Sequence, residues 1–373
     1  MKQRTASYEL LRFLAMIMVV SCHLAGKYSE YCGVDSLSIN GRIALLFSSW
    51  GGVGVMLFWI ISSWFLIDMD FSIIRPLKVL HETLVIGLIN LIADTICLLN
   101  HGGIGYAIKN IVLYEAEQLL TPFWSENWYV TVYVISLIIT PYLNWIINNL
   151  SQEKIKKLLI VFFFIPLMLN FQSAGLVRGG MVYFPYFYLI VGYLKRFKPH
   201  NFFSKNSLIK FCLLSMIYLT IKFFYPVIPK YGLVGFVSMF LPTTLGNDRG
   251  FSFIVGVMSL LLFYGIKDVD VKHKKVILII GKYTFVVYLL HSIFLPISRF
   301  NKWLFIWDFF EKYMLTSNTF LFVAVLTAMI CVIYLICLIA GVIIEIIIVV
   351  PSFEHVKRSF NVIEIIQGYF SSI

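Results

Sequence analysis

Charged side chains are scarce in this chain, because Asp, Glu, Lys and Arg together make up 13% of its 373 residues. A soluble domain has about 25%. Hydrophobic residues instead reach 60%, and apolar runs of roughly 20 residues, the length that crosses a bilayer core, recur along the whole sequence. This composition excludes a soluble globular protein and predicts an all-α, polytopic transmembrane helix bundle.

Several chemical signatures are also missing. The six cysteines have no metal-ligand spacing, and neither has any set of His, Asp and Glu residues, so we expect no metal site. A Gly-x-Ser-x-Gly nucleophile elbow is absent. The net charge of +11 comes from basic residues scattered through short loops, and this dispersal argues against nucleic-acid binding.

The apolar runs predict about ten spans in one domain that covers residues 1–373. With a cytoplasmic N-terminus, about 18 Lys and Arg residues fall in inner segments and about 9 in outer segments, which is the asymmetry of the positive-inside rule. Abundant Ile, Lys, Phe and Asn suggest a bacterial source, so we expect a multi-pass protein of the bacterial plasma membrane. The predicted spans lie near 7–26, 45–67, 79–99, 128–148, 157–173, 181–194, 208–228, 250–266, 276–298 and 319–350.

The first apolar run carries three ionisable residues, Glu9, Arg12 and His23. His23 follows Arg12 by three helical turns, so both side chains share one face, about 16 Å apart along the axis. Exposure of this stripe to lipid would cost several kcal/mol per charge, so we expect it to face the bundle interior or a wet cavity. The alternative is that Arg12 and His23 snorkel towards opposite headgroup layers, with Glu9 paired to Arg12.

An arginine and a histidine separated by ten residues in a first span resemble the signature of the acyltransferase-3 family of membrane acyltransferases. Four later segments are similar, in order, to spans of that family, and the likeness covers almost the whole chain; the segments are 51–67, 127–144, 183–197 and 283–294. Two positions depart from the family pattern. Ser62-Ser63 replaces a Ser-Gly pair, and Arg75-Pro-Leu-Lys78 replaces Arg-x-x-Arg. Lysine attracts phosphate but lacks the planar fork of arginine.

The resemblance implies transfer of an acyl group, commonly acetyl, from cytoplasmic acyl-CoA to a hydroxyl of a cell-surface polysaccharide. Arg12, Arg75 and Lys78 would clamp the phosphates of acetyl-CoA at the cytoplasmic mouth. His23 would meet the acyl carbon, either as a general base or as a nucleophile that carries the acyl group. The expected partners are thus acyl-CoA, a glycan acceptor and the lipid bilayer.

A catalytic histidine needs a group that orients it. Asp94, in the outer half of the third span, and Glu126, at the mouth of the fourth, are the carboxylate candidates. His291 lies in a Tyr-Leu-Leu-His stretch that matches the family, and it belongs either to the site or to the packing of its helix.

Three further expectations concern the last span, the end of the chain and the function. Glu345, in the last span, is expected to pair with Lys282. Many relatives carry an extracytoplasmic esterase-like domain after the bundle, and we expect none here. A transporter or polymerase of lipid-linked glycans is the alternative function, but it has no need of the Arg12–His23 stripe or of a basic mouth for an acyl donor.

Overall fold

The computed structural model describes residues 5–110, 128–171, 176–197, 203, 206–227, 252–295 and 306–359. All regular elements in these ranges are helices, which confirms the predicted all-α class. The α-helices are α1 (Ala6–Tyr31), α2 (Ile39–Ser48), α3 (Gly51–Leu66), α4 (Ile74–Asn110), α5 (Trp128–Asn149), α6 (Gln152–Phe171), α7 (Leu176–Phe197), α8 (Ser207–Phe224), α10 (Phe253–Ile266), α11 (Lys274–Lys282), α12 (Thr284–Leu290), α14 (Ile306–Met314), α15 (Thr319–Ile344) and α16 (Val350–Ser359). Two 3₁₀ turns, η3 (Tyr225–Val227) and η4 (His291–Phe294), and one π-helical segment, η5 (Glu345–Val349), extend them.

Each of the ten predicted spans overlaps at least one helix of the described ranges. Within the described ranges, six helical stretches are long and apolar enough to cross a membrane. A seventh is formed if α11 and the α12–η4 segment, which meet at a bend of 43°, count as one span. The chain is therefore a multi-pass membrane protein.

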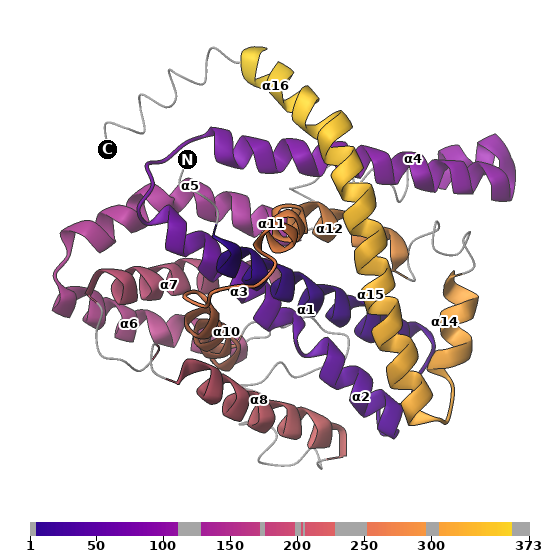
Figure 1. Cartoon of the computed structure of the whole chain (residues 1–373), viewed down its shortest axis with the longest axis horizontal. Coiled ribbons are helices and arrows are strands. Elements are labelled where there is room, and N and C mark those ends of the chain that lie inside the picture. Colours follow the sequence, from indigo (N-terminus) through magenta and orange to yellow (C-terminus); the bar gives the residue numbers. More distant parts are fainter. Residues whose placement is uncertain are drawn as a thin grey trace.

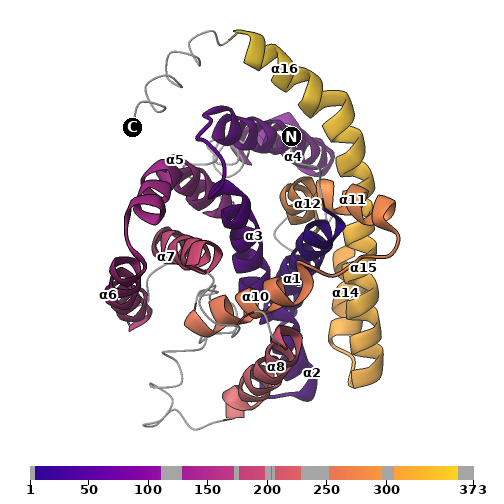
Figure 2. The same cartoon turned by 60° about the vertical axis from the view of Figure 1, so that its left-hand side comes forward.

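Helix α1 is the central element of the bundle. It packs against α3 on one side and against α11, α12 and α15 on the other, and it also contacts α2, α10 and α14 (Figures 1 and 2). Helix α4 lies across the upper part of the bundle in Figure 1, and α6 and α7 lie on the left of the bundle. A polar stripe on α1 can consequently be enclosed by protein.

Two glycines allow the close contacts of α1. A Cβ added at Gly54 of α3 would lie 2.5 Å from the carbonyl oxygen of Ala15, and one added at Gly281 of α11 would collide with the Cβ of Glu9. Side chains at these positions would push α3 and α11 away from α1. The glycines therefore set the spacing of the helices that surround the polar stripe.

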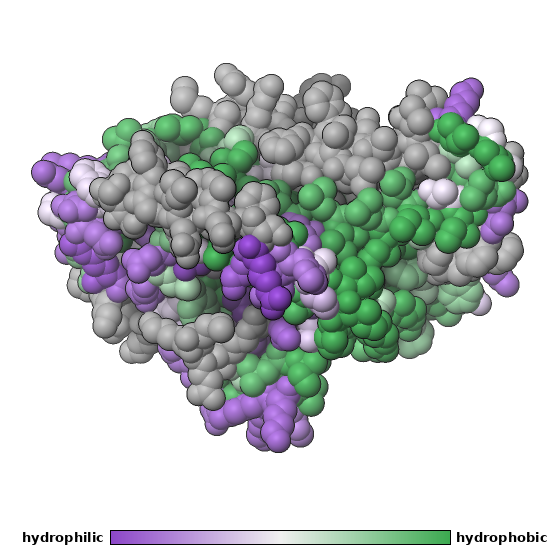
Figure 3. Space-filling view, turned by 90° about the horizontal axis from the view of Figure 1, so that it is seen from above, coloured by the Kyte–Doolittle hydropathy of each residue, from purple (hydrophilic) through white to green (hydrophobic). Residues whose placement is uncertain are grey.

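The outer surface of the bundle is apolar. On α4, exposed side chains recur every three or four residues and so form one stripe: Leu84, Leu88, Ile92, Ile96 and Leu99. Helix α15 and η5 expose a similar set that includes Ile336, Ile339, Ile343, Ile346 and Ile347. Figure 3 shows hydrophobic residues over much of the right half of its view, with hydrophilic residues on the left and at the centre and lower centre. A soluble monomer rarely exposes such a surface, but a bilayer covers it.

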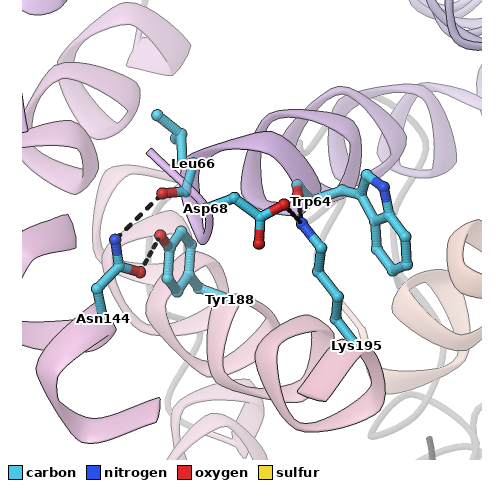
Figure 4. Close-up of polar contacts among 6 residues, drawn as sticks. All are labelled: Trp64, Leu66, Asp68, Asn144, Tyr188 and Lys195. Carbon is cyan, nitrogen blue, oxygen red and sulfur yellow. Dashed lines mark hydrogen bonds and ion pairs between the residues drawn. The ribbon is translucent and has the colours of Figure 1, made fainter. Parts of the chain in front are cut away.

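Asn144 joins three helices at the end of α3 (Figure 4). Its side-chain nitrogen donates a hydrogen bond of 3.1 Å to the carbonyl of Leu66, and its Oδ1 accepts one of 2.6 Å from the hydroxyl of Tyr188. The last carbonyls of a helix have no partner within that helix. Asn144 of α5 satisfies one of them on α3 while it also holds Tyr188 of α7.

Lys195 of α7 makes a second junction at the same end of α3 (Figure 4). Its ammonium donates to the carbonyl of Trp64 and lies 2.7 Å from Oδ2 of Asp68. The two junctions stabilise the position of α3 relative to α5 and α7. The position of α3 is important because α3 and α5 both line the cavity of the candidate active site.

Candidate active site

His23 and His291 contact each other directly, although 268 positions separate them in the chain. Nδ1 of His23 lies 2.6 Å from Nε2 of His291, within hydrogen-bond distance. The ring planes differ by 4° and the ring centroids are 4.9 Å apart. The two imidazoles are therefore coplanar and meet edge to edge rather than face to face.

The local structure of His291 brings it to α1. Helix α12 ends at Leu290, and His291 begins the 3₁₀ turn η4, where its Nδ1 contacts the carbonyl oxygen of Tyr288. The hydroxyl of Tyr28 on α1 donates a 2.8 Å hydrogen bond to the carbonyl of Phe294 and so fastens this turn to α1. His291 is 3% exposed, whereas His23 keeps part of its surface open.

A cavity of about 390 Å³ lies below the histidine pair. Four basic residues contribute to its wall: Arg12, Arg75, Lys78 and Lys282. Val19, Tyr129 and Tyr288 also line it. Val19 is two turns beyond Arg12 on α1 and one turn before His23. His23 itself is outside the lining, but the cavity reaches Tyr288, whose carbonyl contacts His291.

The polar stripe of α1 faces the bundle interior, as predicted. Arg12 forms an ion pair with Glu9, whose side chain is 1% exposed, and its own side chain, 26% exposed, borders the cavity. At the other end of the stripe, His23 contacts His291. The contact with His291 holds His23 inside the bundle and so contradicts outward snorkelling of His23, whereas the Arg12–Glu9 pair is common to both interpretations.

The predicted ion pair between Glu345 and Lys282 is also wrong. Glu345 lies 3.8 Å from the ammonium of Lys78, whereas Lys282 donates a 3.0 Å hydrogen bond to the hydroxyl of Tyr283. Glu345 begins the π-helical segment η5, which packs against α4. The prediction rested on depth in the membrane alone, and the packing of η5 against α4 places the carboxylate beside Lys78 instead. Lys78 remains 49% exposed and still borders the cavity.

The carboxylate candidates for orienting His23 have different outcomes. Asp94 is buried on α4, but within the described ranges it forms no hydrogen bond with His23 or His291. His291 occupies the position next to Nδ1 of His23. Glu126 lies outside the described residues.

The sequence analysis did not predict that three tyrosines, Tyr129, Tyr133 and Tyr288, line the cavity. Tyr129 stacks on Tyr133 and meets Tyr288 edge to face, with ring centroids 5.6 Å and 5.5 Å apart. The hydroxyl of Tyr133 donates a 3.3 Å hydrogen bond to Oγ of Ser62. The spacing of four residues between Tyr129 and Tyr133 indicates one face of a helix, but only the packing of α5 shows that this face borders a cavity.

A comparison with protein families identifies the chain. The model of an acyltransferase domain of the acyltransferase-3 type matches residues 5–338, from the start of α1 to within α15. The chain belongs to the acyltransferase-3 family. No curated protein and no solved structure matches it.

Membership of the acyltransferase-3 family gives the cavity and the histidine pair a chemical setting. An acyltransferase brings together an acyl donor and an acceptor, and the bundle that does so here is embedded in a bilayer. In the described part of the chain, no group of three or more His, Cys, Asp or Glu side chains is arranged to hold a metal ion. The charged residues of the cavity wall are Arg12, Arg75, Lys78, Lys282 and Glu82, and the histidine pair lies beyond its inner end.

Proposed function

We propose that this protein is an integral membrane O-acyltransferase of the bacterial plasma membrane. It transfers an acetyl group from cytoplasmic acetyl-CoA to a hydroxyl of a cell-surface or exported polysaccharide. The observation that carries the proposal is the cavity that joins four basic side chains to the turn of α1 below His23.

The basic end of the cavity suits the phosphates of the acyl donor. Arg12 lies in the second turn of α1, and Arg75 and Lys78 lie in the first two turns of α4. All three border the cavity, at the same end of the bundle. Charge-assisted hydrogen bonds from such groups are strong phosphate contacts. With the N-terminus in the cytoplasm, this end opens towards the cytoplasmic pool of acetyl-CoA.

The inner end of the cavity suits the arm of the acyl donor. Its wall there is aromatic and aliphatic, with Val19, Phe285 and Tyr288 among the lining residues. A thioester that enters past the phosphate clamp would approach the histidine pair, since His23 lies one turn beyond Val19. The acceptor would reach His23 from the opposite side of the membrane.

The transfer itself needs one proton carrier. His23 would take the proton of the acceptor hydroxyl as its oxygen forms a bond to the thioester carbon. The carbon–sulfur bond then breaks, and the departing thiolate of CoA takes the proton from His23. The products are an acetyl ester and free CoA, and His23 returns to its neutral form.

Consumption of acetyl-CoA tests this function against the transporter or polymerase alternative. Membranes that contain the protein and its glycan acceptors are expected to release free CoA thiol from acetyl-CoA and to gain ester-linked acetyl groups. Membranes without the protein provide the control. A transporter or polymerase would leave acetyl-CoA intact, and that result would contradict the proposal.

Cysteine labelling tests the route of the acyl donor. In a background without the six native cysteines, a cysteine replacing Val19 is expected to be protected from a small membrane-permeant thiol reagent by bound acetyl-CoA, because Val19 lines the cavity. Met18→Cys is the matched control, since Met18 is the neighbour of Val19 on α1 but is outside the cavity lining. Equal labelling at both positions, unchanged by acetyl-CoA, would show that the acyl donor takes another route.

A further inference from the structure

The histidine pair differs from a catalytic histidine with a carboxylate orienter. Among the residues that the structure describes, no Asp or Glu side chain forms a hydrogen bond with either imidazole. Nδ1 of His23 faces Nε2 of His291, and Nδ1 of His291 faces the carbonyl oxygen of Tyr288. The three groups form one chain of contacts that ends on the backbone.

The direction of each hydrogen bond in this chain follows from the carbonyl. The oxygen of Tyr288 only accepts, so Nδ1 of His291 carries a hydrogen and donates it. In a neutral imidazole the other nitrogen is then an acceptor, and Nε2 of His291 accepts from Nδ1–H of His23. The remaining nitrogen of His23, Nε2, consequently has a free lone pair.

His291 is suited to a neutral state. It is 3% exposed, and the polar groups that it contacts in the described chain are all uncharged: the backbone carbonyls of Val287 and Tyr288 and the imidazole of His23. A charged imidazolium at this position would lose its hydration without an opposite charge as a partner, which is costly. A buried carboxylate in place of His291 would stabilise a positive charge on His23. A neutral imidazole instead orients the His23 ring through the hydrogen bond.

We propose that His291 is the positioning residue of the reaction, a neutral hydrogen-bond acceptor that holds His23 with its Nε2 free to take the proton of the acceptor hydroxyl. This inference rests on the proposed role of His23 as a base. His291 does not exchange a proton during the reaction. It fixes the tautomer and the plane of the His23 ring, while Tyr288 fixes those of His291.

Two amide variants separate this role from a purely structural one. His291→Gln places a carbonyl oxygen near the position of Nε2 and can still accept from His23. His291→Asn places its amide near the position of Nδ1, so it can donate to the Tyr288 carbonyl but cannot reach His23. We expect His291→Gln to keep kcat within about tenfold of the wild type, and His291→Asn to lose about 10²- to 10⁴-fold. The KM for acetyl-CoA should stay within about twofold in both, because the phosphate contacts are unaffected.

The assay is release of CoA thiol from acetyl-CoA by the full-length protein in membranes that contain its glycan acceptors. Equal kcat values for the two variants, or a wild-type kcat for His291→Asn, would overturn the role of His291. Wild-type protein that releases no thiol would instead contradict the proposed function, so the two failures are distinguishable.

A spectroscopic measurement on the wild-type protein tests the same inference without an activity assay. The wild-type protein, labelled with ¹⁵N-histidine, is expected to show His23 and His291 both as neutral tautomers with hydrogen on Nδ1. The resonances of His23 are assigned by their loss in His23→Gln. A hydrogen on Nε2 of His23, or a charged His291, would overturn the proposal.

Discussion

His23→Ala is expected to abolish acetyl transfer, with a loss in kcat of at least about 10²- to 10⁴-fold, the usual contribution of a general base. The imidazole stands where the polar stripe of α1 meets η4, one turn beyond the cavity. Alanine removes the proton acceptor and leaves the rest of the stripe in place. The rate of CoA release from acetyl-CoA measures the effect, and the KM for acetyl-CoA should change little.

Stability must be measured in the same experiment. The His23→Ala change removes the partner of Nε2 of the buried His291, and a buried polar atom left without a partner costs about 1–3 kcal/mol. His81→Ala is the matched control, because His81 packs its ring on Phe353 and is outside the cavity lining. Most of the activity retained in a folded His23→Ala variant would refute the assignment of His23 as base or nucleophile.

Arg12→Ala is expected to raise the KM for acetyl-CoA by about 10- to 150-fold, because a charge-assisted contact to phosphate contributes about 1.5–3 kcal/mol. Arg75→Ala should act in the same direction, since its side chain borders the same cavity. Lys78→Arg restores the family pattern and should bind the acyl donor at least as well as the wild type. Binding of radiolabelled acetyl-CoA by purified protein checks these affinities without an acceptor.

Because Arg12 is paired with Glu9, the Arg12→Ala change must also be measured in a variant that lacks the Glu9 charge. Removal of one partner of a buried ion pair costs about 3–5 kcal/mol, and the Glu9 side chain is 1% exposed. Glu9→Gln removes the negative charge, so the comparison of Glu9→Gln with the double variant Glu9→Gln/Arg12→Ala isolates donor binding from stability. Arg42→Ala is the matched control, since that guanidinium lies over the ring of Phe223 and outside the cavity lining. Unchanged affinity after loss of both Arg12 and Arg75 would place the phosphates elsewhere.

The features of α1 were predictable because they depend on one helix. The period of 3.6 residues alone places Arg12 and His23 on the same face, and the cost of charge in lipid turns that face inward. The spans likewise follow from the length and apolarity of each run. Such properties are local, so the order of residues suffices to derive them.

The partner of His23 was not predictable in this way. The predicted spans put Asp94, Glu126 and His291 all at a plausible depth, and depth is the only coordinate that a span prediction supplies. The choice depends on rotation and tilt: α11 and the α12–η4 segment meet at 43°, and η4 then presents His291 to α1. The packing of η5 against α4 similarly places Glu345 beside Lys78 rather than Lys282.

By itself, the sequence determined that this protein is a helical membrane bundle with one polar stripe that must be enclosed, and its motifs indicated the acyltransferase-3 family. Both follow from hydropathy, helical periodicity and the order of a few residues along the chain. Only the tertiary structure decided that His23 meets an imidazole and not a carboxylate, and that Tyr129 and Tyr288 border the cavity between the basic residues and that pair. The physical reason is that contacts between helices depend on bends, register shifts and close approach at Gly54 and Gly281. The periodic residue pattern of a single span does not reveal any of these features.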